Sequence, residues 1–301
     1  VVSLTLGHPD GGALPTWKPG AHIEVRLGDG DDALLRQYSL SSSPQDSTRW
    51  RIGVLREPDS RGGSQYVHDR LRDGATVPVG FPRNNFRLRP AARYVFVAGG
   101  IGITPILPMI AQAEADGARW ELLYGGRTRA SMAFLSELER FGDKITVCPQ
   151  DETGLLDLRT LLAEPTEDTL IYCCGPEPLL QAIEAASAHW PVGSLVTERF
   201  AAKKIVRTEP DVAFDVDFAR SGITATVPAG KTVLDVAEEN GIEALSSCKE
   251  GTCGTCEVRI LAGRADHRDS ILTPGEQERN ETMMMCVSRA EKGCSRLVLD
   301  A

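Results

Sequence analysis

Hydrophobic and polar residues alternate along residues 1–90, in short segments separated by turns. Residues 21–27 read AHIEVRL and have a period of two, and residues 50–54, WRIGV, follow that period in part. Pro-Gly, Gly-Asp-Gly and Pro-Asp-Ser sequences separate these segments, as turns between strands do. The pattern predicts an antiparallel β-barrel or sandwich over residues 1–90.

The pattern changes after residue 90 to short apolar strands that alternate with helices. Residues 94–98, YVFVA, form a continuous apolar run typical of a buried parallel strand. A helix is predicted next and ends at Asp116-Gly117. This alternation predicts a doubly wound α/β domain over residues 91–202. The other predicted strands are 120–124, 145–148 and 170–174, and the helices are 105–115 and 177–189.

A polar stretch with a proline, residues 203–213, predicts a linker. Residues 214–301 then form a third, smaller unit. Residues 214–218 and 223–227 alternate like the two strands of a hairpin around Ser221-Gly222, and residues 232–240 predict a helix that ends at Gly241. The mixture of a hairpin and a helix predicts an α+β domain.

Composition narrows the classes of function. A chain of 301 residues is long enough for two or three domains. The net charge of −9 argues against nucleic acid or an anionic membrane surface as a partner. No apolar run reaches the roughly 18 residues of a membrane span, and no signal peptide opens the chain. Because the first residues, VVSLTL, already resemble a strand, we expect further residues to precede Val1.

Four of the eight cysteines lie in a motif near the C-terminus, Cys248-x4-Cys253-x2-Cys256 followed by Cys286. This spacing is that of plant-type 2Fe-2S clusters, whose irons need thiolate ligands. Structural zinc is the alternative, but zinc sites usually pair two short C-x2–4-C units and this chain has one. Reduced thiols of this kind predict a cytoplasmic protein. Cys148, Cys173 and Cys294 are interpreted as core residues.

A glycine-rich turn, GGIGITP over residues 99–105, joins the first strand of the middle region to its helix. Such glycines let the backbone approach a pyrophosphate, and Pro105 suits a first helical turn. The turn is not the G-x-G-x-x-G fingerprint, and GGRTR follows the second strand where that fingerprint has an acidic residue. The arginines of this segment could contact a ribose phosphate or form a solvated surface pair, and the surface pair is the favoured interpretation. The choice between NADH and NADPH therefore stays open. The predicted nucleotide contacts are Gly99, Gly100, Gly102, Thr104, Pro105, Arg127, Cys174, Gly175 and Pro176.

A third motif, RQYSL over residues 36–40, lies on a predicted strand of the first region. Arg36 can hold a phosphate, Tyr38 can lie against a flavin ring and Ser39 can hydrogen-bond the N5 edge of that ring. Gly62-Gly63-Ser64 precedes a helix predicted over residues 65–71, and the N-terminus of such a helix can bind a phosphate. Taken alone, residues 36–40 are better interpreted as an ordinary strand with alternating faces.

The three motifs in this order closely resemble the phthalate dioxygenase reductase family, a branch of the ferredoxin–NADP reductase superfamily. The resemblance covers nearly the whole chain. It implies an FMN-binding β-barrel, a nicotinamide domain and a β-grasp ferredoxin domain, with FMN, NADH and a 2Fe-2S cluster as cofactors. Members of this kind supply electrons to Rieske-type oxygenases or demethylases, and a related arrangement is fused to some bacterial cytochromes P450.

Residues are carried over from the family one at a time. The aromatic Phe200, which alone would be interpreted as core, is expected to cover the flavin. Ser39, Cys174 and Phe200 are expected to lie at the reacting atoms. The FMN contacts implied are Arg36, Gln37, Tyr38, Ser39, Gly53, Val54, Leu55, Gly62, Gly63, Ser64, Thr104 and Phe200.

The predicted chemistry is the conversion of a two-electron transfer from a nicotinamide into single-electron transfers to a 2Fe-2S cluster. A nicotinamide donates a hydride, a 2Fe-2S cluster accepts single electrons, and a flavin can do both. The predicted function is therefore an NADH-dependent reductase for a terminal oxygenase, acting as a monomer. Two rivals stay open: a reductase module of a self-sufficient P450 monooxygenase, and a redox-sensing iron–sulfur flavoprotein, against which rapid reduction of an artificial acceptor by NADH would argue.

Overall fold

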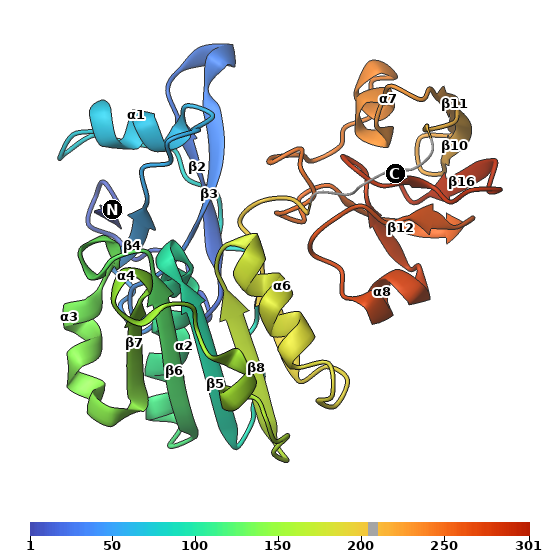
Figure 1. Cartoon of the computed structure of the whole chain (residues 1–301). Helices are drawn as coiled ribbons and strands as arrows, with labels where there is room; N and C mark the ends of the chain where they lie inside the picture. Colours follow the sequence, from blue (N-terminus) through green and yellow to red (C-terminus); the bar gives the residue numbers. More distant parts are fainter. Residues whose placement is uncertain (204–209) are drawn as a thin grey trace. The chain divides into compact units, whose positions relative to one another are not determined.

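A computed structural model describes residues 1–203 and 210–301. The chain divides into two compact units, Val1–Glu198 and Arg199–Ala301 (Figure 1). The first unit holds both the predicted barrel strands and the predicted α/β region. Most of the predicted linker, residues 204–209, lies outside the described residues. The predicted boundary near residue 90 stays a prediction.

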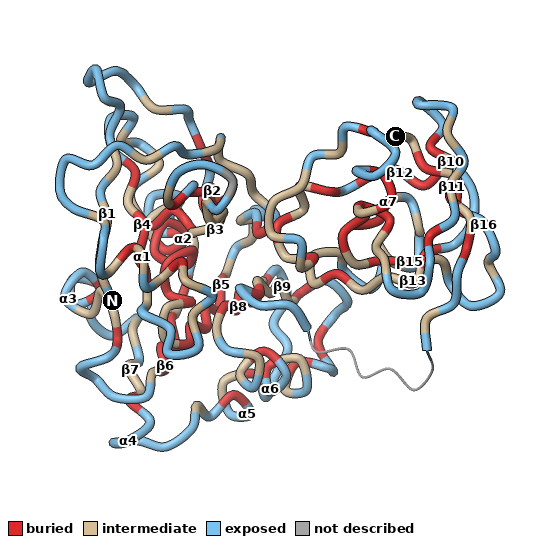
Figure 2. Tube along the Cα trace, turned by 90° about the horizontal axis from the view of Figure 1, so that it is seen from above, coloured by how far each residue is buried: buried red, intermediate tan, exposed pale blue. Residues whose placement is uncertain are grey.

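The first 90 residues form antiparallel strand pairs, as the alternation predicts. β1 pairs with β4, β2 pairs with β3, and a bridge between Leu40 and Ile52 connects the two pairs. Apolar side chains from all four strands contribute to one core, which includes Ile23, Trp50 and Ile52. Figure 2 colours the buried residues along the trace red. The elements are β1 (Val2–Gly7), β2 (His22–Leu27), η1 (Gly30–Asp32), β3 (Leu34–Ser39), β4 (Arg49–Val54) and α1 (Gly63–Asp69).

A parallel sheet of five strands in the order β7-β6-β5-β8-β9 makes the rest of the first unit. The chain goes outward from β5 in one direction and then returns to the other side at β8. The order therefore reverses between β5 and β8, where open α/β sheets bind their ligands. The strands are β5 (Arg93–Gly99), β6 (Arg119–Gly126), β7 (Ile145–Pro149), β8 (Thr169–Cys174) and β9 (Leu195–Glu198).

Successive residues of β5 point to opposite faces of this sheet, and each face has its own core. Phe96 and Ala98 pack in the core that includes α2, whereas Val95 and Val97 pack in the core that includes α6. Two covered faces explain the continuous apolar run in the sequence. The helical elements are η2 (Gly100–Gly102), α2 (Ile103–Ala115), η3 (Arg129–Ser131), α3 (Leu135–Leu138), η4 (Glu139–Lys144), α4 (Gln150–Thr153), α5 (Leu158–Leu161) and α6 (Glu177–Ala186).

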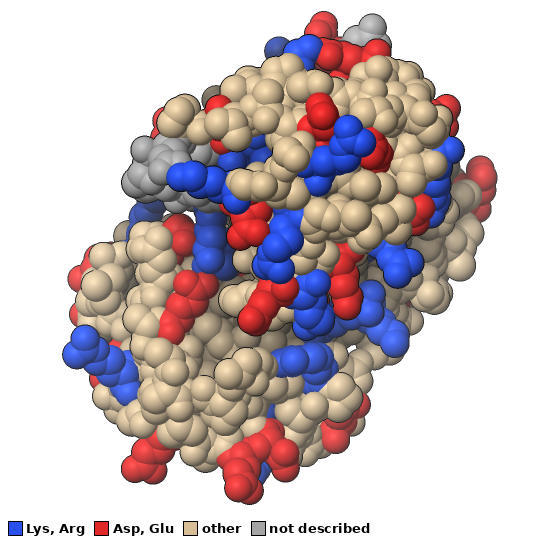
Figure 3. Space-filling model, turned by 90° about the vertical axis from the view of Figure 1, so that its right-hand side faces the viewer, with Lys and Arg blue, Asp and Glu red and all other residues tan. Residues whose placement is uncertain are grey.

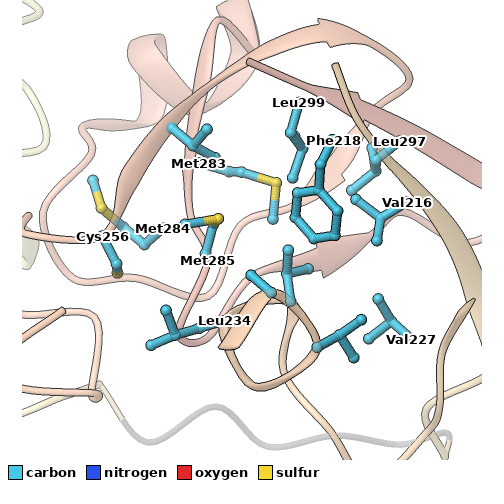
Figure 4. Close-up of a cluster of buried hydrophobic side chains, with 14 of the residues drawn as sticks. Val216, Phe218, Val227, Leu234, Cys256, Met283, Met284, Met285, Leu297 and Leu299 are labelled. Atoms are coloured by element: carbon cyan, nitrogen blue, oxygen red, sulfur yellow. The ribbon is translucent and has the colours of Figure 1, made fainter. Parts of the chain in front are cut away.

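The second unit has a mixed five-stranded sheet in the order β11-β10-β16-β12-β14, packed against α7. Its first and last strands, β10 and β16, pair in parallel at the centre. Figure 4 shows the core, in which Phe218, Leu234 and Leu299 lie near Met283–Met285. The elements are β10 (Phe214–Phe218), β11 (Ile223–Val227), α7 (Val233–Glu239), β12 (Glu257–Ala262), β13 (Ala265–Asp266), α8 (Pro274–Arg279), β14 (Thr282–Met284), β15 (Arg289–Ala290) and β16 (Arg296–Leu299).

The fold class predicted from the sequence is confirmed: antiparallel strands, then a doubly wound parallel sheet, then a small α+β unit. Among the described residues, no helix is long and apolar enough to cross a membrane. On the face shown in Figure 3, Lys and Arg side chains are interspersed with Asp and Glu.

Candidate functional site

The four cysteines of the C-terminal motif come together beside the core of the second unit. Cys248 contacts the side chains of both Cys253 and Cys286, and Cys256 contacts Cys286. Hydrogen bonds to its sulfur from Cys253 and Cys286 hold the pKa of Cys248 far below the usual thiol value, and the same contact raises the pKa of Cys286. The four sulfurs therefore form one connected group.

The loop between the first three cysteines directs its backbone toward the sulfurs. The N–H groups of Glu250 and Thr252 donate to Cys248 Sγ at 3.3 and 3.4 Å. Gly251 has a φ of +71°, and a Cβ there would lie 2.7 Å from Val287 Cγ2 and 3.0 Å from Asp269 Cα. The loop therefore needs glycine at this position for both backbone and space.

This donor set fits an iron–sulfur cluster. Three thiols come from one turn and the fourth from Cys286, just after β14, and N–H donors already face one sulfur. Cys294 stands apart, since its thiol donates to the carbonyl of Arg296 at 3.1 Å.

Two of the three cysteines interpreted as core residues, Cys148 and Cys173, lie in the parallel sheet. Cys173 is buried on β8, as predicted for a core residue. Cys148 is partly buried on β7 and packs beside the same core. Cys294 is also only partly buried, so two of the three predicted core cysteines are less enclosed than expected.

The predicted nucleotide residues that follow β5 meet those that follow β8, at the point where the strand order reverses. A Cβ on Gly102 would lie 2.2 Å from the carbonyl oxygen of Cys174, and a Cβ on Gly99 would lie 2.7 Å from Pro176 Cδ. These two glycines therefore let the loops after β5 and β8 pack against each other. Gly100, with a φ of +55° and nothing within 4 Å of an added Cβ, faces open space. Gly100 is thus the glycine best placed for a phosphate.

The arginines after β6 differ in their surroundings. Arg129 pairs with Glu152 at 3.0 Å, and both side chains are about half exposed. Arg127 is exposed, and its carbonyl accepts a hydrogen bond from the N–H of Asp151 at 3.2 Å. The carboxylates of Asp151 and Glu152, both in α4, therefore lie beside the loop that carries the two arginines.

The predicted phosphate residues of the flavin also come together. Arg36 on β3 packs on the first turn of α1, where a Cβ on Gly63 would lie 2.7 Å from its Nε. The Arg36 guanidinium donates to the carbonyls of Leu35 and Arg61 at 2.8 and 2.5 Å. Ser64 Oγ donates to Ser60 Oγ at 2.9 Å.

The predicted ring residues lie along β3 and β4. Gln37 donates to Glu24 at 3.4 Å, and burial raises the pKa of Tyr38 above its usual value. Val54 is buried, and its carbonyl lies 3.0 Å from His68 Nε2, whereas Leu55 is half-buried just after the strand.

Strand β4 meets the nicotinamide region at Gly53. A Cβ on Gly53 would lie 3.0 Å from Thr104 Cγ2 and 3.1 Å from two ring atoms of Phe134. Thr104 is buried at the start of α2, and its hydroxyl donates to the carbonyl of Ile101 at 2.9 Å. The predicted FMN residue Gly53 and the predicted shared residue Thr104 are therefore neighbours.

Glu198 connects two of the predicted reacting residues and was missed in the sequence. Its carboxyl hydrogen-bonds Ser39, and the Cys174 thiol lies 4.0 Å from its Oε2. Burial raises the pKa of Glu198 to about 8 and, together with Glu198, raises that of Cys174 well above the usual thiol value. Its place at the end of β9, beside the strand that ends in Cys174, is the signal that could have found it.

Phe200, the third predicted reacting residue, belongs to the second unit and is 46% exposed. Its role over the flavin stays a prediction.

Known proteins resemble this chain over its whole length. Residues 216–291 match the family described as "2Fe-2S iron-sulfur cluster binding domain", and residues 96–185 match "Oxidoreductase NAD-binding domain". The phenoxybenzoate dioxygenase subunit beta of Ectopseudomonas oleovorans is 41% identical over 302 residues, covering 100% of this chain and 92% of that one. The crystal structure of a phthalate dioxygenase reductase superposes with a TM-score of 0.70 at 34% identity, covering 99% and 92%.

The chain belongs to the phthalate dioxygenase reductase family. Like that family it is an oxidoreductase that takes electrons from a nicotinamide nucleotide through a flavin to a 2Fe-2S cluster, and the family implies an oxygenase as partner. A longer protein is also similar. An intact type IV self-sufficient cytochrome P450 monooxygenase matches with a TM-score of 0.92 at 45% identity, but this chain, 99% covered, spans only 39% of it.

Proposed function

We propose that this chain carries a hydride from NADH to FMN and passes single electrons to a 2Fe-2S cluster and then to a Rieske-type oxygenase or demethylase. The observation that carries the proposal is the junction of Gly53 with Thr104 and of Ser39 with Glu198 and Cys174. There, residues expected to bind flavin adjoin residues expected to bind nicotinamide. Hydride transfer needs that closeness, because the reacting atoms must come within about 3–3.5 Å.

FMN is the flavin that these residues suit. Arg36, beside the first turn of α1, would pair with its single phosphate, with Gly62, Gly63 and Ser64 supplying backbone and hydroxyl donors. Gln37, Tyr38, Ser39, Gly53, Val54, Leu55 and Thr104 would line the ring, and Phe200 would cover it. When bound, the flavin accepts two electrons together and releases them singly.

The nucleotide would lie on Gly99, Gly100, Gly102, Thr104 and Pro105, against Cys174, Gly175 and Pro176, with Arg127 near the ribose. We propose NADH rather than NADPH. Arg129, the second arginine of this loop, is already paired with Glu152, and Asp151 adds a further negative charge. A 2′-phosphate would therefore meet carboxylates beside a partly neutralised cation.

Cys248, Cys253, Cys256 and Cys286 would hold the cluster in the second unit. Their thiolate sulfurs supply four ligands, and the N–H groups of Glu250 and Thr252 would tune its potential through the Cys248 sulfur. We propose that the chain acts as a monomer and that it works in the cytoplasm, the location that its reduced cysteines predict.

The test is anaerobic reduction of the purified protein, followed by visible absorption. Flavin bands and the broad cluster absorption should both bleach with NADH, and much more slowly with NADPH. A protein that binds zinc and shows no cluster absorption would contradict the cluster assignment. Failure of NADH to bleach a bound flavin would contradict the hydride step.

A second candidate is the reductase module of a self-sufficient P450, which the 45% identity and TM-score of 0.92 favour. Purified Rieske-type oxygenase and P450 haem domain, each offered to the reduced chain, separate the two functions. Faster reduction of the haem domain would select the P450.

A further inference from the structure

Phe134 has an unusual backbone for a large aromatic residue. It precedes α3 with φ 61° and ψ 20°, in the left-handed region that is unfavourable for residues with a Cβ. Contacts around the side chain must offset that cost. Neither the nucleotide motif nor the flavin motif includes this residue.

The Phe134 ring fills the space that Gly53 leaves on β4. Two of its atoms, Cε2 and Cζ, lie 3.1 Å from the position of a Cβ on Gly53, and Thr104 Cγ2 lies 3.0 Å from it. A residue of the nicotinamide region therefore touches the flavin strand, next to the threonine at the start of α2. A side chain at position 53 would therefore push β4 away from Phe134 and Thr104.

Arg51, two residues earlier on the same face of β4, fastens the same segment. Its guanidinium carbon lies 4.7 Å from the centre of the Phe134 ring. It also donates to both carboxylate oxygens of Glu137 in α3, at 2.6 and 2.9 Å. A bidentate pair of this kind fixes orientation as well as distance.

The other side of the segment is tied to the glycine-rich turn. The hydroxyl of Tyr124, fully buried on β6, lies 3.1 Å from the carbonyl of Gly100 and 3.1 Å from that of Ala133. Gly100 is the glycine that faces open space. A continuous path thus joins this turn, through Tyr124 and Phe134, to β4.

We infer that Phe134 is a positioning residue for hydride transfer, setting the separation of the flavin strand from the glycine-rich turn. The inference rests on the proposed function and deepens it, because Phe134 would touch neither cofactor's reacting atoms. Its ring acts as a spacer, Arg51 and Glu137 hold it on β4, and Tyr124 transmits its position to the turn. A displacement of the order of 1 Å can slow such a reaction up to about a hundredfold.

The test is stopped-flow reduction of the flavin by NADH in the full chain with its cofactors. Phe134→Leu keeps an apolar side chain and the same backbone cost but lacks the Cε2 and Cζ atoms. The limiting rate at saturating NADH should fall about tenfold, whereas the dissociation constant of NADH and the FMN content should change less than twofold. Phe141→Leu, which removes a ring that contacts Trp120, should leave the rate unchanged.

A double-mutant cycle distinguishes spacing from general damage. Gly53→Ala places a methyl group against the Phe134 ring and should also slow the limiting rate. Because leucine lacks the atoms that this methyl group meets, Gly53→Ala/Phe134→Leu should be faster than Gly53→Ala alone.

Additive losses in the cycle, or a Phe134→Leu rate within twofold of wild type, would overturn the inference and leave the proposed function intact. If NADH does not reduce the flavin of the wild-type protein, the proposed function itself fails.

Discussion

Glu198 retains its proton at a pH where an exposed glutamate has lost it. Because its pKa is raised from 4.5 to about 8, the folded chain holds a proton that the unfolded chain releases. Its protonation therefore stabilises the fold at low pH, and this contribution declines as pH rises from about 4.5 to about 8. Next to Ser39 and Cys174, a neutral carboxyl can donate a hydrogen bond where a carboxylate cannot.

The first prediction concerns this proton. In flavin-free protein, the infrared band of one protonated carboxyl should disappear near pH 8 and be absent from Glu198→Gln. Ser39→Ala removes a hydrogen bond that lowers the pKa of Glu198, so the band should persist to higher pH. Disappearance of the band near pH 4.5 in the wild type would show that burial does not hold the proton.

The second prediction concerns nucleotide choice. Glu152→Gln releases the charge of Arg129 and should lower the KM for NADPH about threefold, since the freed guanidinium can then pair with the 2′-phosphate and an exposed ion pair is weak. The KM for NADH should hardly change. The control is Glu121→Gln, which breaks the similar pair between Glu121 in β6 and Arg93 in β5. This substitution should alter neither KM. Equal effects of the two substitutions would exclude a local role for Arg129.

At the scale of elements, the cysteine loop depends on close packing as much as on its ligands. The third prediction is that Gly251→Ala loses most of the cluster absorption, because its Cβ would collide with Val287 and with the backbone of Asp269. Gly293→Ala has a similarly positive φ, 89°, but nothing within 4 Å of its Cβ, and should retain the cluster. Loss of the cluster in both variants would point to backbone conformation instead of packing.

A buried ion network fastens the start of the second unit. Asp211 accepts hydrogen bonds from Arg268 at 2.7 and 3.3 Å and lies 3.8 Å from Arg289, and the three side chains are 14%, 10% and 5% exposed. Arg289 also donates to the carbonyls of Val212 and Pro228 and lies over the Phe214 ring. The residues just before β10 are thereby held on the fold.

The fourth prediction is that Asp211→Ala lowers the free energy of unfolding of the second unit by about 1–3 kcal/mol, because Arg268 and Arg289 lose this carboxylate while Arg268 keeps its pair with Asp266. Urea titration, followed by the cluster absorption, measures the change. The control is Asp300→Ala, whose pair with Arg220 is more exposed to solvent and should contribute much less to stability. Equal midpoints for the two variants would contradict a structural role for the network.

Elements with a regular pattern or a clear cap could be predicted from the sequence. The hairpin of β10 and β11 has the predicted bounds, and Thr232 caps α7 through a capping box with Asp235. Strands β12 and β16 were not predicted. In β12 the alternation of buried and exposed residues ends at Ile260, where the register of its pairing with β16 shifts. The helix predicted to His189 ends at Ala186, where the Ser187 hydroxyl bonds the carbonyl of Ile183.

The same contrast holds at the site. Cysteine spacing and glycine-rich turns are local signals, so their residues could be named from the sequence. Glu198 and Phe134 depend on partners far along the chain, Ser39 and Gly53, and only the tertiary fold brings them together. Gly99 and Gly102, which were predicted as nucleotide contacts, allow two loops to pack against each other, whereas Gly100 faces open space.

For the whole molecule, two units with separate cores imply that the electron path can be cut between flavin and cluster. The fifth prediction is that Cys286→Ser abolishes the cluster absorption and the reduction of an oxygenase, whereas NADH still bleaches the flavin. Cys294→Ser should keep the cluster, because Cys294 lies outside the four-sulfur group. A variant of Cys286 with normal transfer to the oxygenase would require a path that bypasses the cluster.

The position of β16 at the centre of its sheet also affects how the protein is made. The sheet of the second unit stays split into two parts until residues 296–299 have left the ribosome, since β10 and β12 both pair with β16. The first unit can fold during synthesis, at about 5–20 residues per second. We therefore expect iron and sulfide to be loaded late, on a chain whose first unit is already folded.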